Sequence, residues 1–80
     1  MIKAAKASEA PVTDWEAFEG EAFGFDHDGN RIVEISRAIT WAGATTRGWA
    51  ALYGRNVVAH GTAGSLREAK TAALAALRAV

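Results

Sequence analysis

The chain has 80 residues, half of them apolar, and its nine acidic and nine basic side chains give a formal net charge of zero. That length suffices for one domain with a modest core, because 19 of the apolar residues are alanine. The lack of cysteine excludes a disulfide framework and thiolate metal sites. We expect a cytoplasmic protein, since no apolar run reaches the ~20 residues of a membrane helix and no signal-peptide pattern opens the sequence.

The first quarter of the chain divides at Pro11. Residues 1–11 have no clear periodicity, so we interpret them as a flexible tail or an edge strand, and residues 12–80 as a single domain. Over residues 12–26 apolar and acidic residues alternate irregularly around two glycines, which predicts one bent strand or two short ones. A short helix at residues 13–18 is the alternative, because Thr13 and Glu16 have capping-box spacing.

The next elements follow from turn residues and alternation. They are a turn at 27–30, a strand at 31–42, a connector at 43–46, a strand at 47–53, a hairpin turn at 54–56 and a last strand at 57–62. The chain is therefore expected to contain about four antiparallel strands.

The register of the predicted hairpin around residues 27–30 decides which aromatic side chains enter the core. A long loop would place Phe25 opposite Val33 and Phe23 opposite Ile35, so that four apolar residues share a face. A strict two-residue loop would instead place Phe23 opposite Glu34. We prefer the long loop because it pairs apolar residues with apolar residues.

A helix is predicted over residues 65–80. Ser65 and Glu68 form a capping box at its start. At 100° per residue an apolar face rich in alanine results, formed by Leu66, Ala69, Ala73, Leu77 and Val80. A thin alanine face suits a helix that lies on a sheet with large side chains. The sequence therefore predicts an α+β fold in two layers, with four strands followed by one helix (ββββα).

Motifs for chemistry are absent from the sequence, so we expect a protein that is not an enzyme and has no cofactor or metal. The acid-rich stretch from Asp26 to Asn30 resembles the opening of a calcium loop, but Arg31 and Arg37 stand where that loop needs glycine and glutamate, which favours a plain turn. His27 and His60 lack metal-ligand spacing. No serine has the base and acid of a catalytic triad beside it.

The charges are sorted along the chain, and this predicts an interaction surface. Seven acidic and no basic residues lie between positions 9 and 28, and basic residues dominate after position 30. We expect the acidic stretch to dock on a basic groove of a partner, with Trp15 as an exposed anchor. The predicted partner-binding residues are Asp14, Trp15, Glu16, Glu19, Glu21, Asp26 and Asp28. The alternative is a basic surface formed by Arg47, Arg55, Arg67, Lys70, Leu74 and Arg78, four of them on a helix stripe opposite the alanine face. A third possibility is a small structural or homo-oligomeric protein that pairs through a sheet edge or the alanine-rich helix. The sorted charges would have no role in binding if they paired with each other across strands.

Two resemblances give these surfaces a function. The segment from Tyr53 onward resembles the second half of a double-stranded-RNA-binding domain, in which a hairpin returns into a helix; Ser65, Arg67, Glu68, Ala69, Lys70 and Ala73 match that pattern. This resemblance implies a nucleic-acid-binding module. As a whole, the small, cysteine-free chain, rich in Ala, Gly and Arg and with sorted charge, resembles phage or mobile-element anti-CRISPR proteins, including inhibitors of the type I-C Cascade complex. That resemblance implies an inhibitor in a bacterial host that blocks target-DNA binding.

Overall fold

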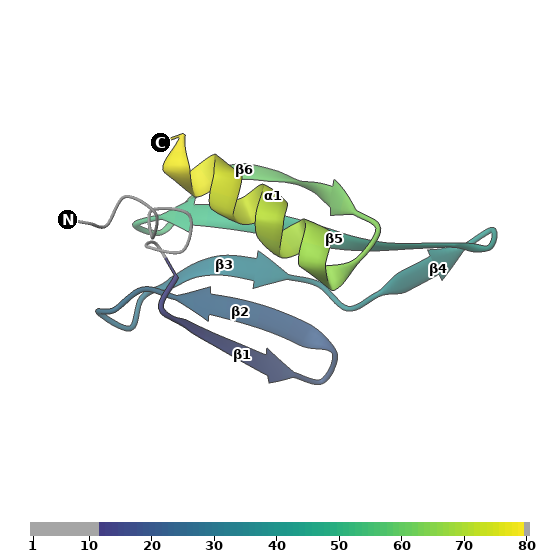
Figure 1. Cartoon of the computed structure of the whole chain (residues 1–80), viewed down its shortest axis with the longest axis horizontal. Coiled ribbons are helices and arrows are strands. Elements are labelled where there is room, and N and C mark those ends of the chain that lie inside the picture. Colours follow the sequence, from purple (N-terminus) through teal and green to yellow (C-terminus); the bar gives the residue numbers. More distant parts are fainter. Residues whose placement is uncertain (1–11, 80) are drawn as a thin grey trace.

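The computed structural model describes residues 12–79 (Figure 1). They form β1 (Asp14–Phe18), β2 (Glu21–Phe25), β3 (Arg31–Ile35), β4 (Ile39–Trp41), β5 (Ala44–Tyr53), β6 (Asn56–Ala63) and α1 (Leu66–Arg78). The predicted α+β class, an antiparallel sheet followed by one packed helix, is confirmed, but the sheet has six strands rather than four. The tail or edge strand predicted at residues 1–11 lies outside the described residues.

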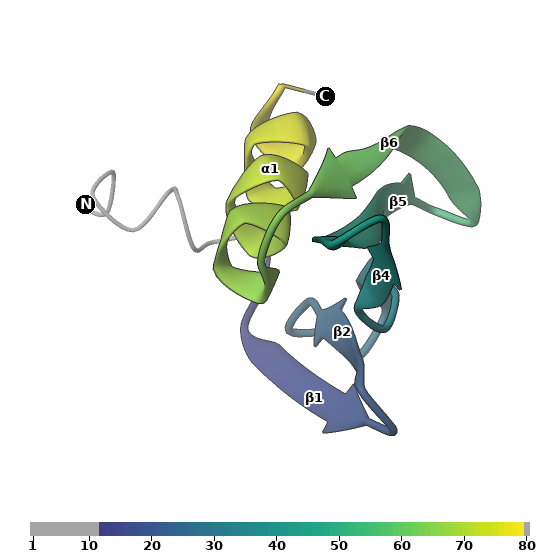
Figure 2. The same ribbon diagram turned by 90° about the vertical axis from the view of Figure 1, so that its right-hand side faces the viewer.

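The long strand β5 is at the centre of the sheet and pairs with β3, β4 and β6. The strands of the sheet are ordered β1-β2-β3-β5, and β6 pairs with the other edge of β5. β3 and β4 both pair with β5, β3 with residues 49–51 and β4 with residues 44–46. The helix α1 lies on one face of this sheet, over β3, β5 and β6 (Figures 1 and 2). The opposite face is left without a second layer in the described part of the chain.

Two tight turns and one break in a strand explain why the sheet has more strands than the sequence predicts. Glu19 and Gly20 connect β1 to β2, and Asp14–Phe18 forms a strand, so the alternative of a helix at residues 13–18 is wrong. Ala42 and Gly43 connect β4 to β5 within the predicted connector. All four residues have positive φ, between 53° and 86°, as a two-residue type I′ hairpin turn requires. The predicted strand over residues 31–42 is split at residues 36–38, where the Gly48 amide donates to Ser36 Oγ at 2.8 Å.

The preferred register of the β2–β3 hairpin is wrong. Phe23 pairs with Glu34, and Ala22 pairs with Ile35. The register shifts at a bulge between Gly24 and Phe25. Compared with the predicted register, the two strands are offset by one residue, so Phe23 and Phe25 lie opposite Glu34 and Arg31 instead of Ile35 and Val33. Both phenylalanines therefore lie on the face away from the helix.

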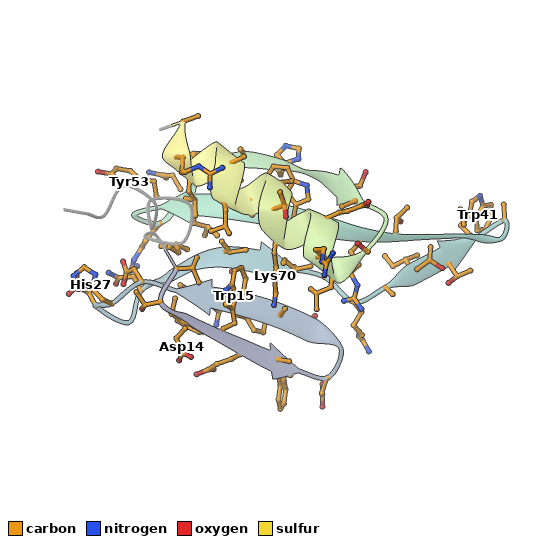
Figure 3. All side chains as sticks on the ribbon, in the orientation of Figure 1. Asp14, Trp15, His27, Trp41, Tyr53 and Lys70 are labelled. Carbon is orange, nitrogen blue, oxygen red and sulfur yellow. The ribbon has the colours of Figure 1, made fainter. Side chains whose placement is uncertain are left out.

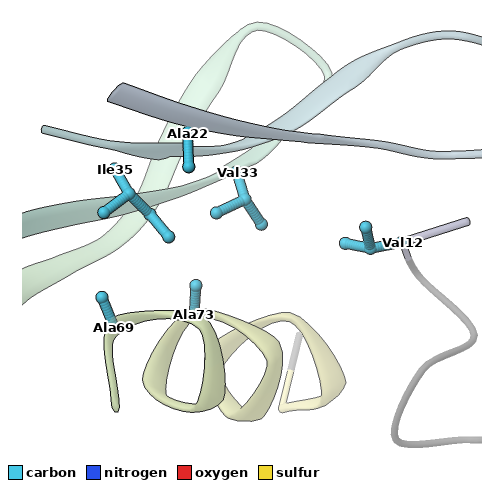
Figure 4. Close-up of a cluster of buried hydrophobic side chains, with 6 residues drawn as sticks. All are labelled: Val12, Ala22, Val33, Ile35, Ala69 and Ala73. Carbon is cyan, nitrogen blue, oxygen red and sulfur yellow. The ribbon is translucent and has the colours of Figure 1, made fainter. Parts of the chain in front are cut away.

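The core lies between the helix and small or branched residues of the sheet. Ala69 and Ala73 of α1 face Val33 and Ile35 of β3, and Ala22 and Val12 complete the cluster (Figure 4). The two helical alanines and Val33 are fully buried. The alanine face is thus confirmed as the packing face of the helix, and its small side chains allow a close approach to the sheet.

The predicted capping box is present with one difference. Ser65 Oγ accepts from the Glu68 amide at 3.1 Å, as expected. Glu68 Oε1, however, accepts from the Gly64 amide at 3.1 Å, one residue before the cap. Two amides at the helix start are therefore satisfied, which fixes the path of the chain from β6 into α1.

Gly24 is required by the packing of Trp15 across the β1–β2 ladder. A Cβ at residue 24 would lie 3.0 Å from Trp15 Cζ3 and 3.2 Å from Val12 Cγ1. We expect Gly24→Ala to lower the free energy of unfolding by about 1–3 kcal/mol, because the core would be overpacked. Urea denaturation measures this loss. Gly48→Ala is the matched control, since a Cβ there meets only ordinary contacts at 3.5 Å or more; an equal loss in both variants would show that strand glycines in general, and not this contact, matter.

Candidate protein-binding surface

A two-stranded arm projects from the body of the molecule. It comprises residues 39–46, that is β4, the turn at Ala42 and Gly43, and the first residues of β5. Figure 1 shows the arm extending beyond the helix and the other strands, and Trp41 lies near its tip (Figure 3). The arm contributes to a molecule that is 46 Å long but only 21 and 20 Å in its other dimensions.

The arm exposes two large apolar side chains. Trp41 is 82% exposed and Ile39 is 59% exposed. As residues i and i+2 of one strand they share a face of the ribbon, and Thr40 and Thr45 lie on the other face with their hydroxyl oxygens 3.1 Å apart. Residues 38–46 contain no charged side chain. The folded chain gains nothing from this exposure, so the arm has the character of an interaction site.

The base of the arm is fixed to the body. Arg47 donates from Nη1 to the carbonyl oxygens of Gly20 at 3.0 Å and Ser36 at 3.3 Å. These bonds join the start of the arm to the β1–β2 turn and to the end of β3. A partner would therefore meet an arm whose base is held in one position, which reduces the ordering cost of binding.

A second surface lies on the side of the sheet opposite the helix. Pairing and alternation place seven residues of β1, β2 and β3 on it, which we call the acidic face: Asp14, Glu16, Phe18, Glu21, Phe23, Phe25 and Glu34. Arg31 lies over the Phe23 ring at 4.6 Å and pairs with Glu34 at 3.1 Å. Four carboxylates and one guanidinium thus surround three phenylalanines.

The acidic face reaches the base of the arm. Glu21 and Ile39 line the same surface depression, together with Ser36, Arg37 and Ala38. An apolar arm and an acidic, aromatic sheet face therefore adjoin each other. A partner that contacts both would need an apolar recess and a basic surface side by side.

The predicted acidic site is only partly assembled. Asp14, Glu16 and Glu21 share the acidic face, but Glu19 lies in the β1–β2 turn, and Asp26 and Asp28 lie in the turn after β2. Asp26 Oδ1 accepts from the amides of Asp28 and Asn30, both at 2.9 Å. The bond from the Asn30 amide is the main cause that lowers the pKa of Asp26 below its usual value. The plain turn predicted at residues 27–30 is confirmed.

Trp15 is not the exposed anchor that the sequence predicted. Its ring covers Gly24 on the helix side of the sheet, and Lys70 Nζ lies 4.6 Å from its centroid. Figure 3 shows Trp15 and Lys70 between β1 and the helix. Trp15 is half-buried and packs against the core, and the exposed tryptophan is Trp41.

The alternative basic residues are dispersed. Arg47 lies at the base of the arm, Arg55 in the turn at the other end of β5, and Arg67 and Arg78 near opposite ends of α1. Two members of the predicted helix stripe do not point away from the core: Leu74 packs against it, and Lys70 lies over Trp15. Arg67, Lys70 and Leu74 line one surface depression, whereas Arg47 and Arg55 lie on other parts of the described structure.

Three further features of residues 12–79 bear on other classes of function. Among them no three His, Asp or Glu side chains gather as metal ligands would. No described helix has the length and hydrophobicity to span a membrane. His60 lines a hollow on the face opposite the helix, together with Ala50 and the acidic-face residues Glu21, Phe23 and Glu34.

The arm is the feature that sequence reasoning missed. Its signal was present: an uncharged stretch in which Ile39 and Trp41 alternate with threonine and alanine around an Ala-Gly pair. The Ala-Gly pair lacks the Asn or Asp that usually marks a type I′ turn, so the stretch was interpreted as the end of a strand and a connector.

Comparisons with protein families, curated proteins and solved structures give no match for this chain. The geometry of its own surfaces therefore carries the functional argument.

Proposed function

We propose that the chain is a non-enzymatic protein-binding inhibitor that docks through its arm and the adjoining acidic face. The exposure of Trp41 and Ile39 on an uncharged ribbon outside the core is the observation that carries this proposal. Tryptophan is the residue most enriched among energetic anchors of protein interfaces. An arm that contributes no buried side chain to the fold is free to present one to a partner.

The charge of the neighbouring face defines the partner's chemistry. Asp14, Glu16, Glu21 and Glu34 favour a surface lined by lysine and arginine, and complementary charge raises the association rate and fixes orientation. Phe18 is largely exposed among these carboxylates and adds apolar contact area. Basic surfaces of this kind are the grooves with which proteins bind nucleic acid.

The whole-chain resemblance to anti-CRISPR proteins supplies the partner that we propose. It is the type I Cascade effector complex of a bacterial host, whose groove for target DNA is basic. Carboxylates spaced along β1 and β2 would occupy positions that phosphates otherwise take, and Trp41 would anchor the arm beside the groove. Bound there, the chain blocks target-DNA binding without any chemical step.

Direct binding to nucleic acid is the weaker alternative. The acidic face would repel phosphates, and Arg47 and Lys70 are engaged by backbone carbonyls and by the Trp15 ring. Arg67 and Lys70 line one surface depression with Leu74, but the predicted Arg47 and Arg55 lie elsewhere in residues 12–79, so the predicted basic residues are not gathered at one phosphate-binding site.

The test of this function is a competition assay with purified type I-C Cascade and labelled target DNA. A stoichiometric amount of the chain is expected to prevent DNA binding when added first. Lack of any complex between the chain and Cascade would exclude this partner, and capture of a partner from a bacterial lysate with the tagged chain, followed by mass spectrometry, would then decide whether the arm binds another protein. Trp41→Ala serves as the matched bait.

Reversing the charge of the acidic face should slow association. We expect Glu16→Lys combined with Glu21→Lys to lower the association rate with the basic partner by about 10- to 100-fold at low salt, with a smaller difference at high salt. Stopped-flow measurements at several salt concentrations give both values. The control is Asp28→Lys combined with Thr71→Lys and Ala75→Lys, which makes the same change of net charge at exposed positions outside the acidic face. An equal loss in the control variant would mean that net charge, and not this face, governs binding.

A further inference from the structure

The two outer strands of the main sheet are protected differently. β1 has five residues, and two of them, Asp14 and Glu16, are charged. β6 has eight residues, with the sequence N-V-V-A-H-G-T-A, and contains no Asp, Glu, Lys, Arg or Pro; its one titratable residue is His60. In residues 12–79 no strand pairs with the outer edge of β6. Natural proteins usually place proline or a charged residue such as lysine on such an edge, because its free backbone groups can pair with another chain.

The composition of β6 suits pairing with a copy of itself. An isologous contact brings the same residues of both chains together, so a charged side chain on the strand would lie close to the same charge on the other copy. β6 has no Asp, Glu, Lys or Arg. After the bulge near Val58 the strand runs regularly from Ala59 to Ala63. Ala59, Gly61 and Ala63 are small, and the Trp49 ring covers Gly61, so none of these three side chains obstructs a strand that pairs along the outer edge.

Exposed apolar residues lie at the start of the same strand. Val57 is 55% exposed, and Val58 and Tyr53 are exposed beside it. With residues 59–63 paired, Val58 would lie opposite Gly64 of the second copy, so the segment between β6 and the helix of that copy would cover part of this surface. The observed exposure and the unpaired backbone groups therefore point to the same occupant at the same edge.

We infer that two copies of the chain pair through their β6 strands in antiparallel orientation, centred near Gly61. His60 of one copy then lies opposite Thr62 of the other. The pairing joins the two sheets into one, with both helices on the same side. Because β6 ends beside the base of the arm, the two arms extend in opposite directions from the joined sheet. The dimer presents two arms, and its formation does not depend on what the arm binds.

The test is the mass of the full chain in solution, measured by light scattering or sedimentation over a roughly hundredfold range of concentration. The wild-type chain is expected to have twice the monomer mass at the upper end. In the variant His60→Lys with Thr62→Lys both positions are exposed, so the monomer should stay folded, while lysines of the two copies would face each other. We expect its dimer dissociation constant to rise by more than about tenfold.

Two controls make the result decisive. Thr71→Lys with Ala75→Lys adds the same charge to the exposed side of α1 and should leave the dimer intact. Trp41→Ala should also remain dimeric. A wild-type chain that is monomeric throughout, a dimer that survives the β6 lysines, or a dimer lost in Trp41→Ala would each overturn the inference.

Discussion

Replacing Trp41 by alanine is expected to weaken partner binding by about 30-fold or more and to leave the unfolding midpoint unchanged. A buried tryptophan anchor typically contributes 2 kcal/mol or more to binding, which corresponds to roughly that ratio of dissociation constants. The side chain is 82% exposed in the free chain, so its removal takes no contact from the core. Titration calorimetry with the partner and thermal unfolding of the same sample give the two values.

Trp15→Ala is the matched control for this prediction, because it removes the same side chain from the other side of the sheet. Trp15 covers Gly24 and contacts Lys70, so its loss should lower stability while the folded fraction still binds the partner. If Trp41→Ala bound as tightly as the wild type, the arm would not be the anchor. If Trp15→Ala alone lost binding at a temperature where it is folded, the interface would lie between β1 and the helix.

The second large effect is expected in the core. Ile35→Ala should lower the free energy of unfolding by about 2–5 kcal/mol, because Ile35 is only 1% exposed and packs beneath Ala69 of the helix. A domain of this size has a total stability at the lower end of about 5–15 kcal/mol, so much of the chain would unfold. Urea denaturation followed by circular dichroism measures the loss.

Ile39→Ala makes the same chemical change only four residues later and should alter stability by no more than about 0.5 kcal/mol, since Ile39 is exposed on the arm. The two isoleucines thus separate folding from function. A large loss of stability in Ile39→Ala would show that the arm belongs to the cooperative core.

The sequence predicted the elements whose signals are local. The capping serine, the alanine face and the glycines before residue 65 together define the helix, and the Asp-Gly-Asn turn after β2 is stabilised by bonds within five residues. Each signal depends on neighbours in the chain. The class of the fold followed because a thin helix must lie on a sheet that supplies larger side chains.

The register between β2 and β3 could not be predicted from pattern alone. Pairing apolar with apolar residues favoured Phe23 opposite Ile35, but the bulge at Gly24 moves the phenylalanines to the acidic face. Glycine is accepted there because Trp15 occupies the space of a side chain. The contact between residues 15 and 24 becomes visible only once the strands are paired.

The candidate site was predicted in chemistry but not in place. The acidic character of β1 and β2 is visible in the sequence, but Trp15, which the sequence predicts as an exposed anchor, is half-buried. Alternation cannot tell which of the three tryptophans lie beneath the helix, since that depends on where the helix crosses the sheet. Trp41 is exposed because the arm extends past the region that the helix covers.

Amide hydrogen exchange of the chain, free and bound to its partner, tests most directly the claim that binding resides in the arm and the acidic face. Backbone amides of residues 39–46 are expected to exchange quickly in the free chain and to become protected in the complex, together with amides of β1 and β2. The outer side of α1 should remain unchanged. Protection confined to the helix, with the arm exchanging as quickly as before, would contradict the account.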